Sequence, residues 1–259
     1  MRLDEYLERI GLKRPLPTNA QTLRQIHLAH LAAFLFTNLE IQQYGTIRVD
    51  LDSVERKFLA GGGGYCFEQN TLLAGVLREL GFSVDTILAR VGSPERRALN
   101  HLLLRVVIDD QPWIADVGFG GEGLLEPLPL VDGLRVEQSG ITYALRRDRY
   151  HWTLSMHCGE TNEDMYEFGD APHTRGDIEI ANHYTATHPD SIFRKTLTIQ
   201  RATPAERLVL RPTVLTRYRN GVREDTPIDP SQLRSIAREV FGVDLGKEPL
   251  LFESLATAR

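Results

Sequence analysis

The 259-residue sequence is poor in features that mark several special classes of protein. It has two cysteines, Cys66 and Cys158, which is too few for a disulfide framework; we therefore expect a reducing compartment, the cytoplasm. No run reaches the roughly 18 consecutive apolar residues of a membrane span, and the charged first residues do not predict a signal peptide. The net charge of -5 argues against a general nucleic-acid binder.

What is present changes in pattern along the chain. Helical spacing of apolar residues predicts helices over residues 3–10 and 23–35, and a third helix that follows Cys66 and ends at Gly81. The remaining signals are short apolar runs at residues 84–91, 102–108, 113–117, 142–146 and 151–156, an Asn220-Gly221 hairpin signal after residues 208–218, and a helix near residues 231–241. The order of helices, then antiparallel strands, then a small mixed unit predicts an α+β fold.

Four consecutive glycines followed by Tyr65 and Cys66 form the most informative segment. Glycine permits positive φ and lets other groups approach the backbone closely. A cysteine between such a turn and a helix start lies near unpaired N–H groups and the positive end of the helix dipole, which favours the nucleophilic thiolate. Cys66 is therefore a candidate nucleophile, with a buried structural cysteine as the alternative.

His101 and Asp116 are the candidate partners of Cys66. His101 opens one predicted strand and Asp116 lies in the next. If a two-residue turn at residues 109–110 joins these strands, the two side chains are diagonal neighbours on one face, about 7–8 Å apart between backbones. A four-residue turn would instead set Asp116 opposite Arg105. Because a buried carboxylate needs a partner, we predict a triad of cysteine, histidine and aspartate.

Asp116 is followed directly by a second glycine-rich turn, VGFGG at residues 117–121. Such a turn can present N–H groups to a phosphate or an oxyanion, and a plain strand exit is the alternative. His27 and His30 share a helix face at a spacing that a metal could use. No cysteine or carboxylate pattern accompanies them, so no metal site is predicted.

The candidate residues lie in longer motifs that keep a fixed order over nearly the whole chain. These are YLERIG at residues 6–11, FTNL at 36–39, GGYCFEQN at 63–70, His101, DVGFG at 116–120, and residues 182–193 with Pro189, Ser191 and Phe193. In this combination the sequence resembles the arylamine N-acetyltransferase family. Several long motifs in order are far more specific than any one of them.

The resemblance implies a particular form of the α+β fold. It has an N-terminal helical bundle, a central antiparallel β-barrel and a C-terminal α/β lid, with a cysteine-protease-like catalytic core. The helical domain with Cys66 would span residues 1–82, the barrel with His101 and Asp116 residues 83–200, and the lid residues 201–259.

The resemblance also implies a ping-pong acetyl transfer. Cys66 would attack the thioester of acetyl-CoA with help from His101, while Asp116 orients the imidazole. The acetyl group would then pass to a small-molecule arylamine or hydrazine, without nucleic acid, membrane or metal. Phe36, Val91, Phe119 and Phe193 would line the acceptor pocket, and the coenzyme would lie near Gly118, Gly120 and Gly121.

Three positions depart from the family pattern. Gly62 stands where the family usually has arginine, Thr37 where it has glutamate, and Asn100 where it has threonine. One explanation is that the family's arginine and glutamate form an ion pair and that this chain has lost both members, which can be nearly neutral. This hypothesis requires Gly62 and Thr37 to lie close together.

Other functions remain open on the sequence alone. An amide synthase of the same fold would take a polyketide from a carrier protein and close it into a macrolactam. A cysteine hydrolase would use the same three residues with water as the acceptor. A binding protein with a dead site conflicts with the complete triad.

Overall fold

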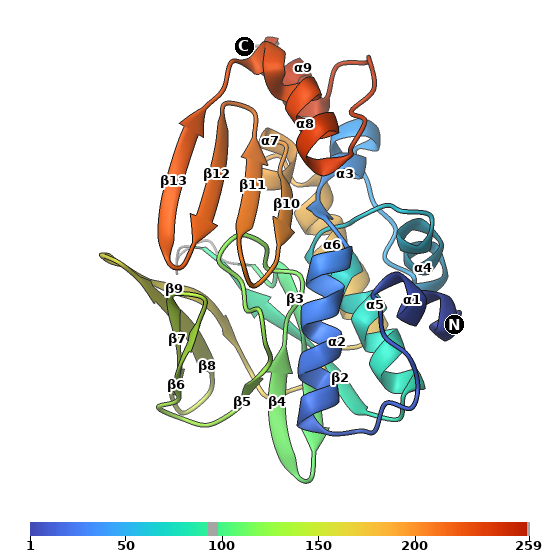
Figure 1. The fold of residues 1–259 in the computed structure, drawn as a ribbon, viewed down its shortest axis with the longest axis vertical. Coiled ribbons are helices and arrows are strands. Elements are labelled where there is room, and N and C mark those ends of the chain that lie inside the picture. Colours follow the sequence, from blue (N-terminus) through green and yellow to red (C-terminus); the bar gives the residue numbers. More distant parts are fainter. Residues whose placement is uncertain (93–97, 258–259) are drawn as a thin grey trace.

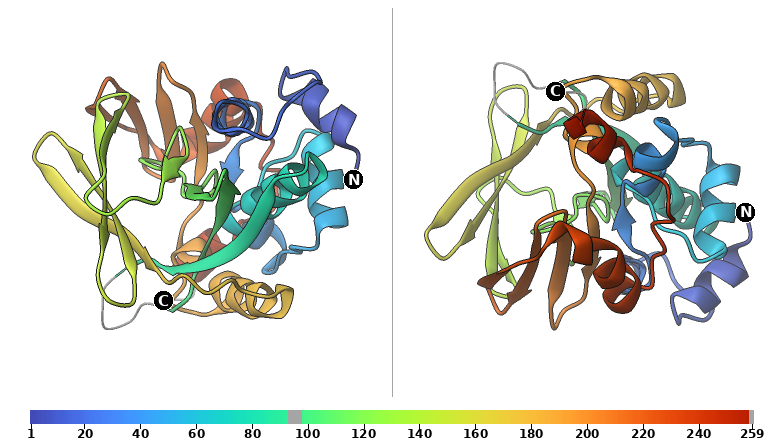
Figure 2. Two further views of the ribbon diagram at one scale, coloured as in Figure 1. Left: turned by 90° about the horizontal axis from the view of Figure 1, so that it is seen from below. Right: turned by 90° about the horizontal axis from the view of Figure 1, so that it is seen from above.

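The computed structural model describes residues 1–92 and 98–257 of the chain. Helices of the first third stand beside a large curled antiparallel sheet, and a smaller antiparallel sheet lies above both in Figure 1. In both views of Figure 2 the blue N-terminal helices and the yellow-green strands lie on opposite sides. Within the described residues, no helix combines the length and the apolar character that crossing a membrane requires.

The elements follow the predicted order. The helices are α1 (Leu3–Arg9), α2 (Ala20–Ala33), α3 (Leu39–Tyr44), α4 (Leu51–Leu59), α5 (Cys66–Glu79), α6 (Arg175–Thr187), α7 (Ile192–Lys195), α8 (Leu233–Phe241) and α9 (Leu251–Thr257), with a 3-10 turn at Pro230–Gln232. The strands are β1 (Phe36–Thr37), β2 (Ser83–Arg90), β3 (His101–Ile108), β4 (Gln111–Ala115), β5 (Leu128–Pro129), β6 (Arg135–Gln138), β7 (Ile141–Arg147), β8 (Trp152–Cys158), β9 (Thr161–Phe168), β10 (Ile199–Ala202), β11 (Arg207–Arg211), β12 (Val214–Arg219) and β13 (Val222–Pro227).

The helices predicted from apolar spacing are α1, α2 and α5. α2 begins earlier than predicted because the side chain of Asn19 accepts the N–H of Thr22 at 2.9 Å, which caps the helix. The short helices α3 and α4 are not predicted. In α4 the signal was present, because Leu51, Val54 and Phe58 stand at helical spacing and Asp50 accepts the N–H of Ser53 at 3.0 Å, which caps the helix.

The larger sheet has the strand order β5-β4-β3-β2-β9-β8-β7-β6. It curls strongly, as Figure 1 shows, and α5 packs against β3 and β2, the third and fourth strands in that order. Among the described strands no pairing joins β5 to β6, so a closed barrel is not confirmed. The sheet is antiparallel, as predicted.

The β3–β4 hairpin has the register that the triad prediction needs. Leu104 pairs with Ala115, which makes the connection a two-residue turn. Asp109 and Asp110 have φ values of 48° and 61°, and positive φ at both central positions gives the tight turn that fits the twist of a hairpin. The four-residue alternative is therefore excluded, and His101 and Asp116 share one face of the sheet.

The smaller sheet joins distant parts of the chain. Its order is β1-β10-β11-β12-β13, so the two-residue strand β1 pairs with β10 across more than 160 positions of sequence. The predicted hairpin at Asn220 and Gly221 connects β12 to β13, with positive φ at both residues. The boundary predicted at residues 200 and 201 falls inside β10, and the division into three domains stays a prediction.

Candidate active site

Cys66 is the first residue of α5, where the chain leaves the first glycine turn, residues 61–64. The residue is only 2% exposed and belongs to a buried cluster with Phe36, Tyr65 and Leu102. Because α5 packs on β2 and β3, the start of this helix faces the beginning of β3. The fold thus directs the thiol toward the strand end that carries His101.

The first glycine turn is held by backbone pairing with the segment before α3. The N–H of Gly64 donates to Leu35 O at 3.2 Å, and the N–H of Thr37 donates to Gly64 O at 3.0 Å. A Cβ atom on Gly63 would overlap the carbonyl oxygen of Leu35. Glycine is required here for close approach of two backbones.

His101 and Asp116 form the predicted pair. His101 Nε2–H donates to Asp116 Oδ2 at 2.7 Å, and both side chains are almost completely buried. With Nε2 engaged, Nδ1 is the ring nitrogen available to Cys66, and the thiol lies close enough to raise the pKa of the imidazole. The structure therefore brings the three predicted residues together.

The charges of the pair stabilise each other. Burial by itself lowers the pKa of His101, but the negative charge of Asp116, its hydrogen bond and the contact with Cys66 together raise that pKa well above its ordinary value. Burial favours the neutral carboxyl of Asp116, and the His101 charge with its hydrogen bond outweighs this and lowers the Asp116 pKa. The site therefore favours a protonated His101 imidazolium beside an ionised Asp116 carboxylate. A protonated imidazole is the form that can pair with a thiolate.

Two residues that the sequence did not identify as part of the site complete the hydrogen bonds of Asp116. Asn70 Nδ2 donates to Asp116 Oδ1 at 3.0 Å and to Leu102 O at 2.6 Å. His27 Nε2 accepts the backbone N–H of Asp116 at 3.1 Å. Asn70 lies four residues after Cys66, on the same face of α5, so helical spacing was a usable signal. Nothing in the sequence relates His27 to Asp116.

Aromatic rings enclose His101. The Phe119 ring meets it edge-on with centroids 5.5 Å apart, and the Tyr166 ring lies at 5.2 Å. The Tyr166 hydroxyl is buried near Asp116 without a well-formed hydrogen bond. These rings limit the access of water to the imidazole, and Tyr166 is a contact that sequence reasoning did not find.

The residues predicted to line an acceptor pocket divide into two groups. Phe36 packs in the cluster that contains Cys66, and Phe193 lies beside it with ring centroids 6.3 Å apart. Phe119 and Val91 pack on the neighbouring cluster of the large sheet. The first group adjoins Cys66, and Phe119 of the second contacts His101; the role of all four residues as acceptor contacts stays a prediction.

The second glycine turn, residues 118–121, lies against the nucleophile. A Cβ atom on Gly118 would be 2.6 Å from the Cα of Cys66. The N–H of Gly118 donates to Asp116 Oδ1 at 2.9 Å, and the N–H of Gly121 donates to Gln200 Oε1. The N–H groups of Gly118 and Gly121 therefore already have acceptors within the protein. Neither is free to donate to a bound coenzyme in this arrangement.

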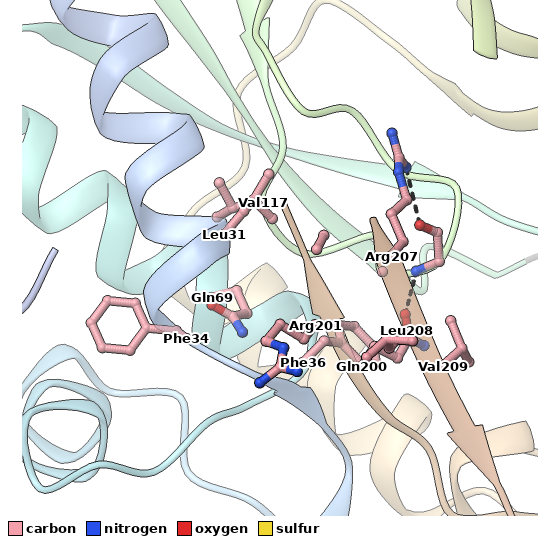
Figure 3. Close-up of a pocket in the computed structure, with 13 residues that line it drawn as sticks. Leu31, Phe34, Phe36, Gln69, Val117, Gln200, Arg201, Arg207, Leu208 and Val209 are labelled. Carbon is pink, nitrogen blue, oxygen red and sulfur yellow. Dashed lines mark hydrogen bonds between the residues drawn. The ribbon is translucent and has the colours of Figure 1, made fainter. Parts of the chain in front are cut away.

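The smaller sheet fixes the second turn through two side chains. Besides Gln200, the buried Arg207 donates to Gly121 O at 3.0 Å and to Gly123 O at 2.5 Å. Figure 3 shows both side chains reaching the turn from β10 and β11. They border a narrow cavity of about 20 Å³ that Phe36 and Gln69 also line.

The two histidines of α2 are saturated with hydrogen bonds. His30 Nε2–H donates to Gln69 Oε1 at 2.7 Å and its Nδ1 accepts from Tyr6 at 2.8 Å. His27 Nδ1–H donates to Leu125 O at 2.8 Å. Burial lowers the pKa of His27 to about 4 and that of His30 to about 3, so both rings are neutral. Among the described residues no group of three metal-ligating side chains is found.

Comparison with known proteins decides the family. A family model described as N-acetyltransferase matches residues 19–250. The arylamine N-acetyltransferase of Escherichia coli (strain K12) is 35% identical over 263 aligned residues, which cover 98% of this chain and 94% of the relative. The chain belongs to the arylamine N-acetyltransferase family.

Solved structures of arylamine N-acetyltransferases have the same fold. The enzyme of Mycobacterium abscessus matches with a TM-score of 0.91 and 31% identity, over 99% of this chain and 95% of that one. The Mycobacterium marinum enzyme, solved in complex with CoA, matches with a TM-score of 0.88 and 27% identity, over 95% of each chain. The family and enzyme class predicted from the motifs are confirmed: this is an acyltransferase with a mixed α+β fold.

The departures from the family pattern have a structural setting. The N–H of Thr37 donates to the carbonyl of Gly64, two residues beyond Gly62, so the two segments are neighbours as the hypothesis requires. The Asn100 side chain pairs with both backbone groups of Val91, at 2.8 and 3.0 Å. Asn100 thus ties the end of β2 to the start of β3, next to His101. The ion-pair explanation for Gly62 and Thr37 stays a prediction.

Proposed function

We propose that this arylamine N-acetyltransferase moves an acetyl group from acetyl-CoA to the nitrogen of an arylamine or hydrazine through a thioester on Cys66. The observation that carries the proposal is the buried His101–Asp116 pair at 2.7 Å beside a thiol at a helix start. This is the arrangement that activates a cysteine nucleophile. The complex of the Mycobacterium marinum enzyme with CoA supports the choice of donor.

The residues have distinct roles in two half-reactions. Cys66, as thiolate, attacks the acetyl carbonyl, and His101 gives a proton to the departing thiol of the coenzyme. The amine then attacks the acetyl-Cys66 thioester, while His101 takes a proton from the nitrogen and Cys66 leaves as thiolate. Asp116 keeps the ring oriented and stabilises its charge throughout. Among the first-turn N–H groups of α5, that of Glu68 already donates to Tyr65 O at 3.0 Å, and those of Cys66 and Phe67 can stabilise the oxyanion in both steps.

The acceptor and the coenzyme would contact different parts of the site. Phe36, Val91, Phe119 and Phe193 would receive the aromatic acceptor. The coenzyme would pass the second turn at Gly118, Gly120 and Gly121, and contact its backbone surface. The smaller sheet would act as the lid over a cysteine-protease-like core, since Gln200 and Arg207 bind that turn.

The test is mass spectrometry of the protein after brief incubation with acetyl-CoA. We expect a gain of about 42 Da, one acetyl group, on the peptide that contains Cys66, and its loss on addition of an arylamine. Cys66→Ser should give no stable adduct and no turnover, whereas Cys158→Ser should behave as the wild type. An adduct only from a carrier-bound acyl chain would instead mean an amide synthase, which the similarity to arylamine N-acetyltransferases does not favour.

A further inference from the structure

A partly buried cluster of charged side chains lies next to the start of α5, the helix that carries Cys66. Lys57 Nζ of α4 is 2.7 Å from Glu68 Oε1 of α5 and 3.0 Å from Glu40 Oε2 of α3. The Glu68 side chain is 1% exposed, whereas those of Lys57 and Glu40 are 20% and 34% exposed. An ionised carboxylate buried this deeply requires a partner, and Lys57 is the cation that meets it.

Glu68 fixes the start of the helix that carries the thiol. Its second oxygen, Oε2, accepts the backbone N–H of Tyr65 at 3.2 Å. That N–H belongs to the residue before Cys66, so the carboxylate restrains the chain where it enters α5. A Cβ atom on Gly64 would be 2.5 Å from the same Oε2. The first glycine turn is therefore shaped around this carboxylate.

Lys57 also occupies the space beside Gly62. The N–H of Gly62 donates to Lys57 O at 2.9 Å. A Cβ atom on Gly62 would lie 2.9 Å from both Cγ and O of Lys57. A long side chain at position 62 and the present path of Lys57 thus compete for the same volume. The present position of Lys57 therefore depends on the absence of a side chain at Gly62.

We propose that Lys57 is a positioning residue that, by pairing with Glu68, holds the entry of α5 so that the Cys66 thiol stays aligned with His101. The inference rests on the proposed function only in that Cys66 is the nucleophile. Lys57 acts through Glu68 and the Tyr65 amide and does not touch substrate.

The charges around Glu68 make this arrangement sensitive to pH. Burial raises the pKa of Glu68 to about 7 and the Glu40 charge adds to this, while Lys57 and the Tyr65 N–H oppose it. Across the first turn, Arg9 of α1 approaches Gly61, and Tyr65, whose buried phenol is near the charges of Cys66 and Glu68, is a further ionisable neighbour. Without Lys57 the carboxyl would be neutral at pH 7 and a weaker acceptor for the Tyr65 N–H.

The first experiment measures alkylation of Cys66 by iodoacetamide from pH 5 to 9, followed by mass spectrometry. Lys57→Met should slow alkylation at pH 7 about tenfold and move the profile up by about one pH unit, because the thiol loses its alignment with the imidazolium. Lys57→Arg should retain the wild-type profile, and so should Lys247→Met, which removes an exposed lysine elsewhere. A wild-type profile for a folded Lys57→Met protein would overturn the proposal.

A second comparison separates positioning from general loss of stability. In a Glu68→Gln background the amide accepts the Tyr65 N–H without needing a cation, so Lys57→Met should slow alkylation less than threefold. An equal loss in both backgrounds would mean that Lys57 acts on folding alone and would refute the inference. Alkylation needs no acetyl donor. Absence of the acetyl adduct on wild-type Cys66 would therefore refute the proposed function and leave this coupling intact.

Discussion

The two glycine turns of the active site have similar composition and are held in different ways. The first, residues 61–64, pairs its backbone with residues 35–37 and packs around Glu68, which lies two residues after Cys66. The second, residues 118–121, is held by Gln200 and Arg207 of the distant smaller sheet. Gly63 and Gly64 leave no room for a Cβ atom. Gly120 and Gly121 have positive φ values of 75° and 44°, which favour glycine.

The comparison suggests a division of labour. The first turn places the nucleophile by contacts within the N-terminal third, and the second places the carboxylate that supports the base. Each can be perturbed separately, and the expected effects differ in size.

The largest effect should come from the residue that the second turn presents. Asp116→Asn removes the charge that raises the pKa of His101, so the ring loses its proton at a lower pH and no longer pairs with the thiolate near pH 7. Single-turnover acetylation of Cys66 should fall by roughly 10³–10⁴-fold, by analogy with other triads. A loss below tenfold would mean that the second turn does not serve catalysis through Asp116.

The next effect tests the contact between the second turn and the nucleophile. Gly118→Ala would push a methyl group against the Cα of Cys66 and the Asn70 amide, both 2.6 Å from the added atom. We expect about a 100-fold loss of kcat/KM, since a displacement near 1 Å at reacting groups is this costly. Gly169→Ala is the matched control: like Gly118 it has no positive φ, and the nearest neighbour of the added atom is Tyr150 O at 3.9 Å, an ordinary contact. Equal losses would show that the contact with Cys66 and Asn70 is not the cause.

Loss of the distant anchor should affect stability first. Arg207→Met removes the Arg207 donor of the Gly121 carbonyl and one of the two donors of the Gly123 carbonyl, which Tyr143 also meets, so urea unfolding should reveal a loss of about 2–4 kcal/mol. Arg211→Met, at the exposed end of the same strand, should change stability by less than about 0.5 kcal/mol. If the two variants unfold alike, the smaller sheet does not hold the second turn.

The smallest effect concerns pH and the first turn. The folded pKa of Glu68 is about 7 against an ordinary value of 4.5, so the folded state retains its proton longer and this residue lowers stability as pH rises from about 4.5 to 7. Glu68→Gln should remove that decline and raise the midpoint of thermal unfolding at pH 7.5, relative to pH 4.5, by about 3 °C or more compared with wild type. Glu137→Gln, an exposed change, serves as the control. If the unfolding midpoints of wild type and Glu68→Gln change with pH in parallel, the raised pKa of Glu68 is contradicted.

The sequence predicted the parts of the site that depend on local rules. The position of Cys66 follows from a glycine turn before a helix stripe, and the facing of His101 and Asp116 follows from a two-residue hairpin. The parts that it did not predict depend on approach between distant segments. His27 reaches Asp116 across 89 positions and Gln200 reaches Gly121 across 79, and neither pair shares a pattern in the chain.

Lys57 is a different kind of omission. It lies nine residues before Cys66 on a short helix that was not predicted, so the direction of its side chain could not be inferred. The departure at Gly62 was visible in the sequence. Its meaning required the position of a side chain from α4. For the fold, α+β with antiparallel sheets was predictable, while the open edge of the large sheet depends on pairing that short strands do not reveal.

The two-residue strand β1 has a consequence for dissection of the molecule. Phe36 pairs with Gln200 on one side and bridges to Gly64 on the other, so a single peptide links the loop before the thiol to the last sheet of the chain. A fragment that stops before residue 199 would leave the main chain of residues 36–37 facing water along one edge. The C-terminal quarter is therefore part of the structure that supports Cys66, and deleting it should destabilise the loop before the thiol.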